Sequence, residues 1–451
     1  MRHAAIIPLL AASASLSACT LAPKYIQPAP PIAAAWPVEA PAPSDAPVKW
    51  RDLFTDPRLQ ATIDLALEQN RDLRVAALNV EKAQAQYRIT RAGLLPEIDA
   101  SISNPRNQAG RNYTASLGLS AYEVDLFGRV RSLKNAAVES FFSMRENRNA
   151  VQISLIAAVT TQWLTLAADQ DQLRLAQQTL ATRMDALTIA EGRSRIGVLS
   201  DLDLAAIQGL AETARADVAR LQTVIDQDKS ALTLLAGAPL TADRLPDGLQ
   251  TGQVADALPV GLPSDVLLDR PDVLAAEHDL KSANANIGAA RAAFFPRISL
   301  TGSTGSSSSD LDDLFKSGNG TWSFVPTISI PIFAGGANAA SLKSAEASRD
   351  IAVAQYEKAI QSAFSEVSDA LAVRARIDER LNAQTAATDA AQRSLTLSQA
   401  RYDNGVDSYL TLQDAQRTLY ASQQTLIGLQ ALRATNLVAL YKALGDDGSL
   451  Q

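Results

Sequence analysis

Short segments in which apolar and polar residues strictly alternate are the first pattern along the chain. In one of them, Leu117 and Leu119 alternate with Ser116 and Gly118. A period of two places successive side chains on opposite faces, so each segment predicts a strand of roughly 10 residues with one apolar face. Four strands are predicted, at about 97–104, 113–127, 297–305 and 321–333. Polar loops at 104–112 and 305–320 join the members of each pair.

Helical spacing of apolar residues precedes each pair of strands. It covers about 56–93 in the first half of the chain and 264–293 in the second half. Pro96 and Pro296 follow these stretches. Because the residue before a proline disfavours helical backbone, we expect both helices to end there.

Two much longer helical stretches follow the strands. Neither 129–191 nor 337–404 contains a glycine or a proline, and as helices each would span on the order of 90–100 Å. Each stretch reaches a glycine, Gly197 or Gly405, where we expect the chain to turn and return as a second helix. Glycines at 237 and 445 are the expected C-caps of the returning helices. The predicted hairpins therefore cover 129–237 and 337–445.

These patterns occur twice in the same order. The segment 91–98 matches 291–298 at an offset of 200 residues, and Gly197 matches Gly405 at an offset of 208. Landmarks in a constant order with slowly growing offsets indicate a tandem duplication with small insertions. The body then divides into a first repeat, 51–250, and a second repeat, 251–451, with a linker rich in proline and glycine near 238–263.

Strands that are apolar on one side only are typical of a membrane β-barrel. An open sheet edge in a bilayer leaves N–H and C=O groups unpaired, at several kcal/mol each. Four strands are too few to close alone, since the smallest such barrels have eight. We therefore predict a mainly α-helical protein with a membrane β-barrel portion, whose barrel closes by association of two, three or four chains. The alternative is a soluble coiled-coil protein with a small sheet.

The N-terminus has the features of an export signal. A basic start at Arg2, an apolar stretch and small residues predict a signal peptide over 1–18. The sequence Leu16–Cys19 resembles the bacterial lipobox, which implies that Cys19 becomes the lipidated first residue of the mature protein. The alternative is an ordinary cleavage site that precedes a cysteine. Proline-rich residues 19–50 are predicted to form an extended arm.

Composition argues against several functions. The chain has 41 Lys and Arg against 48 Asp and Glu, and this net charge of −7 disfavours a nucleic-acid partner. His3, His278 and Cys19 are the only histidines and cysteine, too few for a Cys/His metal site or a Ser-His or Cys-His catalytic set. We therefore expect no enzyme and no cofactor apart from lipid on Cys19. An enzyme that uses two carboxylates alone is left open.

Two further runs carry a family resemblance. The opening Trp50–Pro57 and the second-repeat run Arg401–Gln416 resemble the outer membrane factors of the TolC/OprM/NodT group, most closely its lipidated OprM-like branch. The resemblance implies a TolC-like homotrimer with a 12-stranded barrel in the outer membrane and a long helical tunnel across the periplasm. It further implies a passive duct for drugs or other small molecules. That duct docks a periplasmic adaptor (membrane fusion) protein and an inner-membrane pump of the RND type.

The resemblance also implies a gate on the last long helix, at Leu410 and Asp414. Their spacing of four places both on one helix face, so a trimer would carry an apolar ring and a ring of three carboxylates. In the first repeat the matching residues are Leu202 and Ala206, so one repeat alone supplies the acid. The alternative for Asp414 is an ordinary solvated helix carboxylate.

The hairpin tips are the second implied site. We expect them to contact the adaptor, although some of their residues could instead hold a closed state through salt bridges between neighbouring tips. The tip residues are Arg193, Arg195, Gly197, Val198, Leu199, Arg401, Gly405, Val406 and Asp407.

Other functions remain as alternatives. A periplasmic adaptor also has a lipidated cysteine and a helical hairpin, but it has one hairpin, whereas this chain has two. Within the channel class, metal efflux and type I secretion are alternatives to drug efflux. The pump selects the cargo, so the duct sequence does not name it.

Overall fold

The structure of the protein is a computed structural model, and it describes residues 20–36, 49–107, 110–250, 252–255 and 264–445. The predicted signal peptide and Cys19 lie outside the described residues. The chain forms two compact units, each assembled from three separate segments. The first unit contains Ala76–Asn147 and Asp272–Ala359, and the second contains Arg148–Pro271 and Ile360–Gln451, each with part of the N-terminal region.

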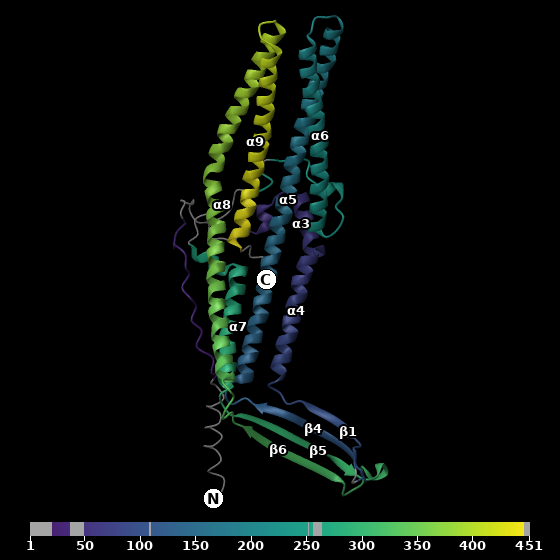
Figure 1. The fold of residues 1–451 in the computed structure, drawn as a ribbon, viewed down its shortest axis with the longest axis vertical. Helices are drawn as coiled ribbons and strands as arrows, with labels where there is room; N and C mark the ends of the chain where they lie inside the picture. The colour runs from purple at the N-terminus through teal and green to yellow at the C-terminus, as the bar shows by residue number, and fades with distance from the viewer. Residues whose placement is uncertain (1–19, 37–48, 108–109, 251, 256–263, 446–451) are drawn as a thin grey trace. The chain divides into compact units, whose positions relative to one another are not determined.

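A four-stranded antiparallel sheet is the main feature of the first unit (Figure 1). The strand order is β1-β4-β5-β6, so the central pair, β4 and β5, joins the two repeats. A small hairpin of β2 (Arg106–Asn107) and β3 (Gly110–Arg111) extends the first loop. Strands β1 and β6 are the edges of the described sheet. The main strands are β1 (Ile98–Ser103), β4 (Tyr113–Val124), β5 (Arg297–Ser308) and β6 (Gly320–Ser329).

The register separates the sheet into a polar face and an apolar face. On the polar face, hydroxyl oxygens of neighbouring strands approach each other, at 3.1 Å for Ser101 and Ser116 and 2.8 Å for Ser303 and Ser323. On the other face, the side chain of Trp322 is 81% exposed in the monomer. A large apolar side chain is unfavourable on a surface that faces water. The exposed apolar residues of this face are Ile98, Ile102, Leu117, Trp322, Phe324 and Ile328.

Two strands end earlier than the alternation of residues predicts. Strand β4 ends at Val124 rather than 127, and β6 ends at Ser329 rather than 333. Their shared neighbour β5 begins at Arg297, which pairs with Ser329 of β6, so β6 has no ladder partner further on. The last residue of β4, Val124, pairs with Ile298, one residue from the start of β5. Pro331 also lacks the N–H that a continued ladder requires.

Strand β5 in turn is longer than predicted. Ser306–Ser308, which we expected in a polar loop, pair with β4, and Ser306 also pairs with Gly320 of β6. The serines continue the ladder because backbone groups form it, and strands on both sides are available to pair. A serine-rich segment therefore lies in the sheet and not in the loop.

Two helical hairpins repeat with equal lengths. Helix α5 (Arg129–Arg195) and helix α8 (Ala337–Asp403) each have 67 residues, about 100 Å at the α-helical rise. Their returning partners, α6 (Asp201–Ala236) and α9 (Tyr409–Leu444), each have 36 residues. Equal helices in the two halves agree with the tandem duplication. Gly237 and Gly445 are the left-handed C-caps of α6 and α9.

Helix α5 is also long and apolar enough to cross a membrane by length and composition. More than half of its most apolar 18-residue window, 56%, is buried inside the chain. A lone helix of this kind is weak grounds for a membrane span, because the core helix of a water-exposed domain has the same composition. Trp163, which is fully buried, is one of the α5 residues in the core.

The shorter helical stretches are interrupted where we expected continuous helices. Asn70 separates α3 (Pro57–Gln69) from α4 (Arg71–Ala92). Its Oδ1 accepts hydrogen bonds from the N–H groups of Asp72 and Leu73, which caps α4, and its Nδ2 donates to the Leu235 carbonyl. In the second repeat, a 3-10 turn (Ser264–Asp269) precedes α7 (Pro271–Ala292), which begins at a proline.

The main core of the second unit forms around α3, α5 and α6. The short helix α2 (Trp50–Leu53) starts the run that carries the family resemblance, and Phe54 follows it. Phe54 meets Tyr441 edge-on at 5.4 Å between ring centroids. Trp163 donates from Nε1 to the carbonyl of Arg244 at 3.1 Å. The opening run is therefore a structural part of the core.

Described residues of the N-terminal arm lie against helices. In the first unit, Asn284 of α7 donates to the carbonyl of Pro23 at 2.8 Å, and Tyr25 donates to Glu277 at 2.9 Å. A Cβ on Gly288 of α7 would lie 2.7 Å from the backbone nitrogen of Ala22, so the absent side chain leaves room for the arm. Residues 20–36 contain no helix or strand, as the prolines predict.

Replacing Gly237 by alanine should destabilise the protein far more than replacing Gly197. Both glycines have left-handed backbone, with φ of +72° and +76°, so both changes cost about 1–2 kcal/mol in strain. At Gly237 the added Cβ would also lie 2.6 Å from the carbonyl carbon of Gln69, whereas at Gly197 no atom lies within 4 Å. The clash should add about 1–3 kcal/mol. Chemical unfolding in detergent measures both changes, and equal losses would contradict the packing of α6 on α3.

Candidate functional site

Both hairpin tips are closed by the same left-handed glycine turn. Gly197 and Gly405 have φ of +76° and +72°. In each tip the residue after the glycine donates back across the turn, from Val198 to the carbonyl of Arg193 at 3.0 Å and from Val406 to that of Arg401 at 2.9 Å. The glycine N–H bonds the carbonyl three residues earlier. This is a Schellman motif, which satisfies the last carbonyls of a helix and reverses the chain.

The tips present apolar and basic side chains outward. Val198 and Val406 are 67% and 61% exposed in the monomer, and Arg193 and Arg195 are also exposed. Leu199 behaves differently, since it is partly buried against neighbouring helices. The predicted tip residues are therefore divided between an outward surface and an internal contact.

An ion pair stabilises the second tip internally. Arg401 binds Asp407 with two hydrogen bonds, of 2.6 Å from Nε and 2.9 Å from Nη2. The hydrogen bond from Arg401 lowers the pKa of Asp407, and the same bond raises the pKa of Arg401. The carboxylate is thus engaged within its own tip. The alternative that tip residues form salt bridges between neighbouring tips, and so hold a closed state, stays a prediction.

Leu410 and Asp414 lie on one exposed face near the start of α9, as their spacing predicts. Leu410 is 62% exposed, and the side chain of Asp414 is 56% exposed. Asp414 forms an ion pair with Arg417, one turn further along α9. Our sequence reasoning missed Arg417, although an acid and a base three residues apart on a helix were a usable signal.

The opposite face of α9 joins the two hairpins. Tyr409 and Leu412 are buried in a cluster with Leu187 of α5 and Ile207 and Ala211 of α6. Because this face is held in the cluster, the face with Leu410 and Asp414 points away from it. The packing of the two hairpins therefore decides which face of α9 is free.

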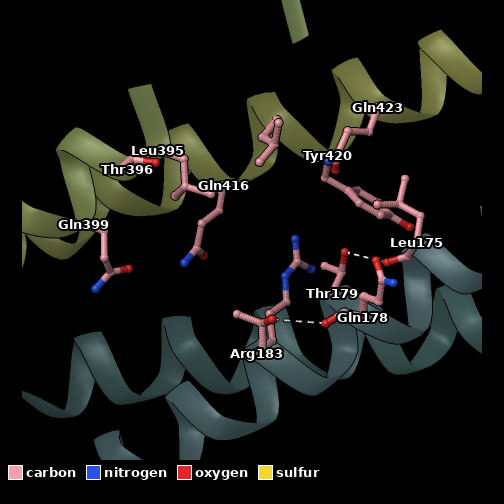
Figure 2. Close-up of a pocket in the computed structure, with 12 residues that line it drawn as sticks. Leu175, Gln178, Thr179, Arg183, Leu395, Thr396, Gln399, Gln416, Tyr420 and Gln423 are labelled. Carbon is pink, nitrogen blue, oxygen red and sulfur yellow. Dashed lines mark hydrogen bonds between the residues drawn. The ribbon is translucent and has the colours of Figure 1, made fainter. Parts of the chain in front are cut away.

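A polar contact joins the hairpins further from the tips. The Tyr420 hydroxyl of α9 donates to the Asp217 carboxylate of α6 at 3.1 Å. Burial, followed by the charge of Asp217 and their hydrogen bond, raises the pKa of Tyr420 to about 12, so the phenol keeps its proton. Arg183 of α5 lies over the Tyr420 ring, with its Cζ 5.8 Å from the ring centroid (Figure 2). A single sequence offered no signal for this contact, because its members are far apart along the chain.

Replacing Tyr420 by phenylalanine should loosen the contact between the hairpins. A hydrogen bond to a charged group contributes about 1.5–3 kcal/mol, and its loss should lower the unfolding free energy by a similar amount. The control is Tyr402→Phe, since the Tyr402 hydroxyl forms no hydrogen bond with other described side chains. The bond is complete below pH 10, the ordinary pKa of tyrosine, and is lost as the pH rises through about 12. Denaturant unfolding should therefore give the same difference in unfolding free energy between wild type and Tyr420→Phe at pH 7 and at pH 9. An equally large loss of unfolding free energy in Tyr402→Phe would contradict the prediction.

Metal ligands are sparse in the described part of the chain. No group of three or more His, Cys, Asp or Glu side chains there is placed to hold a metal ion. His278 binds Glu139 through Nδ1 at 2.7 Å, an acid–base contact within the first unit. The absence of a cofactor stays a prediction.

Comparison with known proteins identifies the family. The family model described as outer membrane efflux protein matches the chain twice, over residues 62–238 and 262–446. The probable efflux pump outer membrane protein TtgC of Pseudomonas putida is 46% identical, over 95% of this chain and 93% of the relative. The outer membrane protein OprJ of Pseudomonas aeruginosa is 40% identical, over 96% of this chain and 95% of the relative.

A solved structure shares the fold over nearly its whole length. The open-state outer membrane channel MtrE of Neisseria gonorrhoeae is 41% identical and matches with a TM-score of 0.87, over 95% of this chain and 98% of that one. The family match in each half also agrees with the duplication. The chain therefore belongs to the outer membrane efflux protein family, as an outer membrane efflux channel with the TolC-like fold.

Proposed function

We propose that three copies of this chain form the exit duct of a tripartite efflux system. The observation that carries the proposal is the four-stranded sheet, with its apolar face exposed and β1 and β6 at its edges. In a bilayer these edges require partners, and pairing β6 of one copy with β1 of the next supplies them. Three copies give 12 strands, the count that the resemblance to the OprM-like channels implies.

In the assembled barrel, the apolar face contacts lipid and the hydroxyl face lines the duct. Ser101, Ser116, Ser303 and Ser323 belong to that lining, and they are small and uncharged. These hydroxyls give the membrane part of the duct a hydrophilic wall, as a passive water-filled channel requires.

Leu410 and Asp414 form the gate of this duct. Their exposure on the free face of α9 supports the proposal, because in a trimer that face is available to line the axis. The leucines form an apolar ring that resists wetting, and the carboxylates form an acidic ring that attracts cations.

The exposed tips dock a periplasmic adaptor, which links the duct to an inner-membrane pump of the RND type. Outward apolar side chains at both tips, Val198 and Val406, support this role because exposed apolar groups favour a protein partner. The duct itself catalyses no reaction and needs no cofactor. Its cargo is small apolar molecules and drugs, as relatives are described as toluene and antibiotic efflux pump outer membrane proteins.

The lipid on Cys19 anchors the chain in the outer membrane. The lipobox resemblance supports this proposal, and so does the arm, whose residue Leu21 accepts a hydrogen bond from Arg291 of α7 at 3.3 Å. Leu21, two positions after Cys19 in the sequence, thus contacts the first unit. Mass spectrometry of the mature N-terminus tests the acylation.

The experiment that tests the assembly is light scattering of the detergent-extracted protein, corrected for bound detergent. A protein mass of three chains is expected. A mass of one chain would overturn the proposal, because four strands would then remain open. A mass of two or four chains would overturn the 12-stranded barrel but keep closure by association.

A further inference from the structure

A cavity lies between the two hairpins in the second unit. It has a volume of about 440 Å³ and is lined by α5 of the first hairpin and by α8 and α9 of the second (Figure 2). Small-molecule sites commonly have volumes of about 300–1,000 Å³. The cavity is therefore large enough for an organic molecule that touches both hairpins.

A buried cation faces this cavity. Arg183 of α5 is only 8% exposed, and its side chain rises from α5 toward α9 in Figure 2. Its Nη1 donates to the carbonyl of Leu210 at 3.0 Å, but no carboxylate among the described residues lies within ion-pair distance. The neighbouring carboxylate of Asp217 binds Tyr420 and Arg220.

A charge in this position is costly. Burial lowers the pKa of Arg183, yet a guanidinium stays protonated at physiological pH. Buried charges are ordinarily paired, since an uncompensated charge away from water loses its hydration. Within the described protein, the Leu210 carbonyl, the Tyr420 ring and the nearby charge of Asp217 offset part of this loss, but none of them forms an ion pair with the guanidinium.

The remaining lining adds free donors and an apolar wall. The side-chain amides of Gln416 and Gln423 line the cavity and form no hydrogen bond with other described groups. The Thr179 and Thr182 hydroxyls, in contrast, donate to carbonyls of their own helix. Leu175, Leu395 and Leu419 supply apolar surface. One cation, free amides and leucines suit a ligand with an anionic group and an apolar body.

We propose that this cavity binds a small organic anion, whose carboxylate pairs with Arg183 and whose apolar body lies against the leucines and Tyr420. The ligand contacts α5 as well as α8 and α9, so its binding energy requires the hairpins to be packed together. A ligand that binds only one arrangement stabilises that arrangement. Occupancy therefore opposes separation of the hairpins. This inference goes beyond the proposed duct function and does not require three chains.

The test uses 2-naphthoate, with the uncharged 2-naphthamide as its matched compound. We expect calorimetry of the detergent-solubilised full chain to give saturable naphthoate binding with a Kd of about 0.1–1 mM and at least tenfold weaker binding of the amide. Naphthoate should also raise the unfolding temperature. Equal binding of the two compounds would overturn the proposal. So would the absence of naphthoate binding at about 10 mM, ten times the weakest expected Kd.

Three variants locate the site. Arg183→Gln removes the cation, and Gln416→Glu places a carboxylate in the cavity, so each should weaken naphthoate binding at least tenfold. If Arg183→Gln does not fold, Gln416→Glu still tests the proposal. The control is Arg376→Gln, which removes an exposed arginine that does not line the cavity. Wild-type binding by folded Gln416→Glu, or an equal loss in Arg376→Gln, would overturn the assignment.

Discussion

Replacing Gly305 by alanine is expected to abolish assembly of the barrel. Gly305 lies in β5 opposite Ser116 of β4, at the junction of the two repeats. A Cβ at this position would lie 2.6 Å from the Cα of Ser116 and collide with the carbonyl oxygen of Ala115. These are backbone atoms of a paired strand, so they cannot move aside without separating β4 from β5. Breaking that pair would leave two separate hairpins in place of a sheet.

The matched control for Gly305→Ala is Gly118→Ala. Gly118 lies in the same strand pair, but its added Cβ would be 3.6 Å from the nearest atom, an ordinary contact. We expect the yield of assembled protein, measured by size-exclusion chromatography and light scattering, to fall at least tenfold for Gly305→Ala, about 1.4 kcal/mol or more. Gly118→Ala should assemble normally. Equal yields from the two variants would contradict the observed register of β4 and β5.

Replacing Asp414 by alanine should raise the open conductance of the duct and weaken its block by multivalent cations. In the proposed trimer the change removes three carboxylates from one ring. It also leaves Arg417 without its ion-pair partner, so three paired carboxylates are replaced by three unpaired arginines. Cations near a ring of like charge are repelled, and the affinity of a trivalent blocker should fall at least tenfold. Recordings in planar bilayers measure both quantities.

Two further substitutions test the position of the gate. Asp226→Ala removes an exposed acid of α6 that pairs with Lys229, and it should leave conductance and block unchanged. Ala206→Asp adds an acid at the position of the first repeat that matches Asp414, and block should become stronger if that position also faces the axis. Unchanged conductance and block in Asp414→Ala would show that Asp414 is a solvated helix carboxylate without a role in the gate.

Local sequence determines much of this fold because its elements depend on short-range physics. Alternation of apolar and polar residues defines the faces of the strands. Two helices of 67 residues are permitted because neither contains a proline and their only glycine, Gly192, lies close to the end of α5. Gly197 and Gly405 stand where each chain reversal requires left-handed backbone. The same landmarks occurring twice revealed the duplication.

Tertiary structure decided where the elements end and what they contact. Strands β4 and β6 end within one residue of the start of β5, and Ser306–Ser308 join the sheet because partners exist. Tyr420, Asp217 and Arg183 come from three different helices, so only their packing could bring them together. Likewise, burial of Tyr409 and Leu412 determines that Leu410 and Asp414 stay exposed. Local preferences thus specify the elements, whereas pairing and burial depend on residues distant in sequence that no short-range pattern encodes.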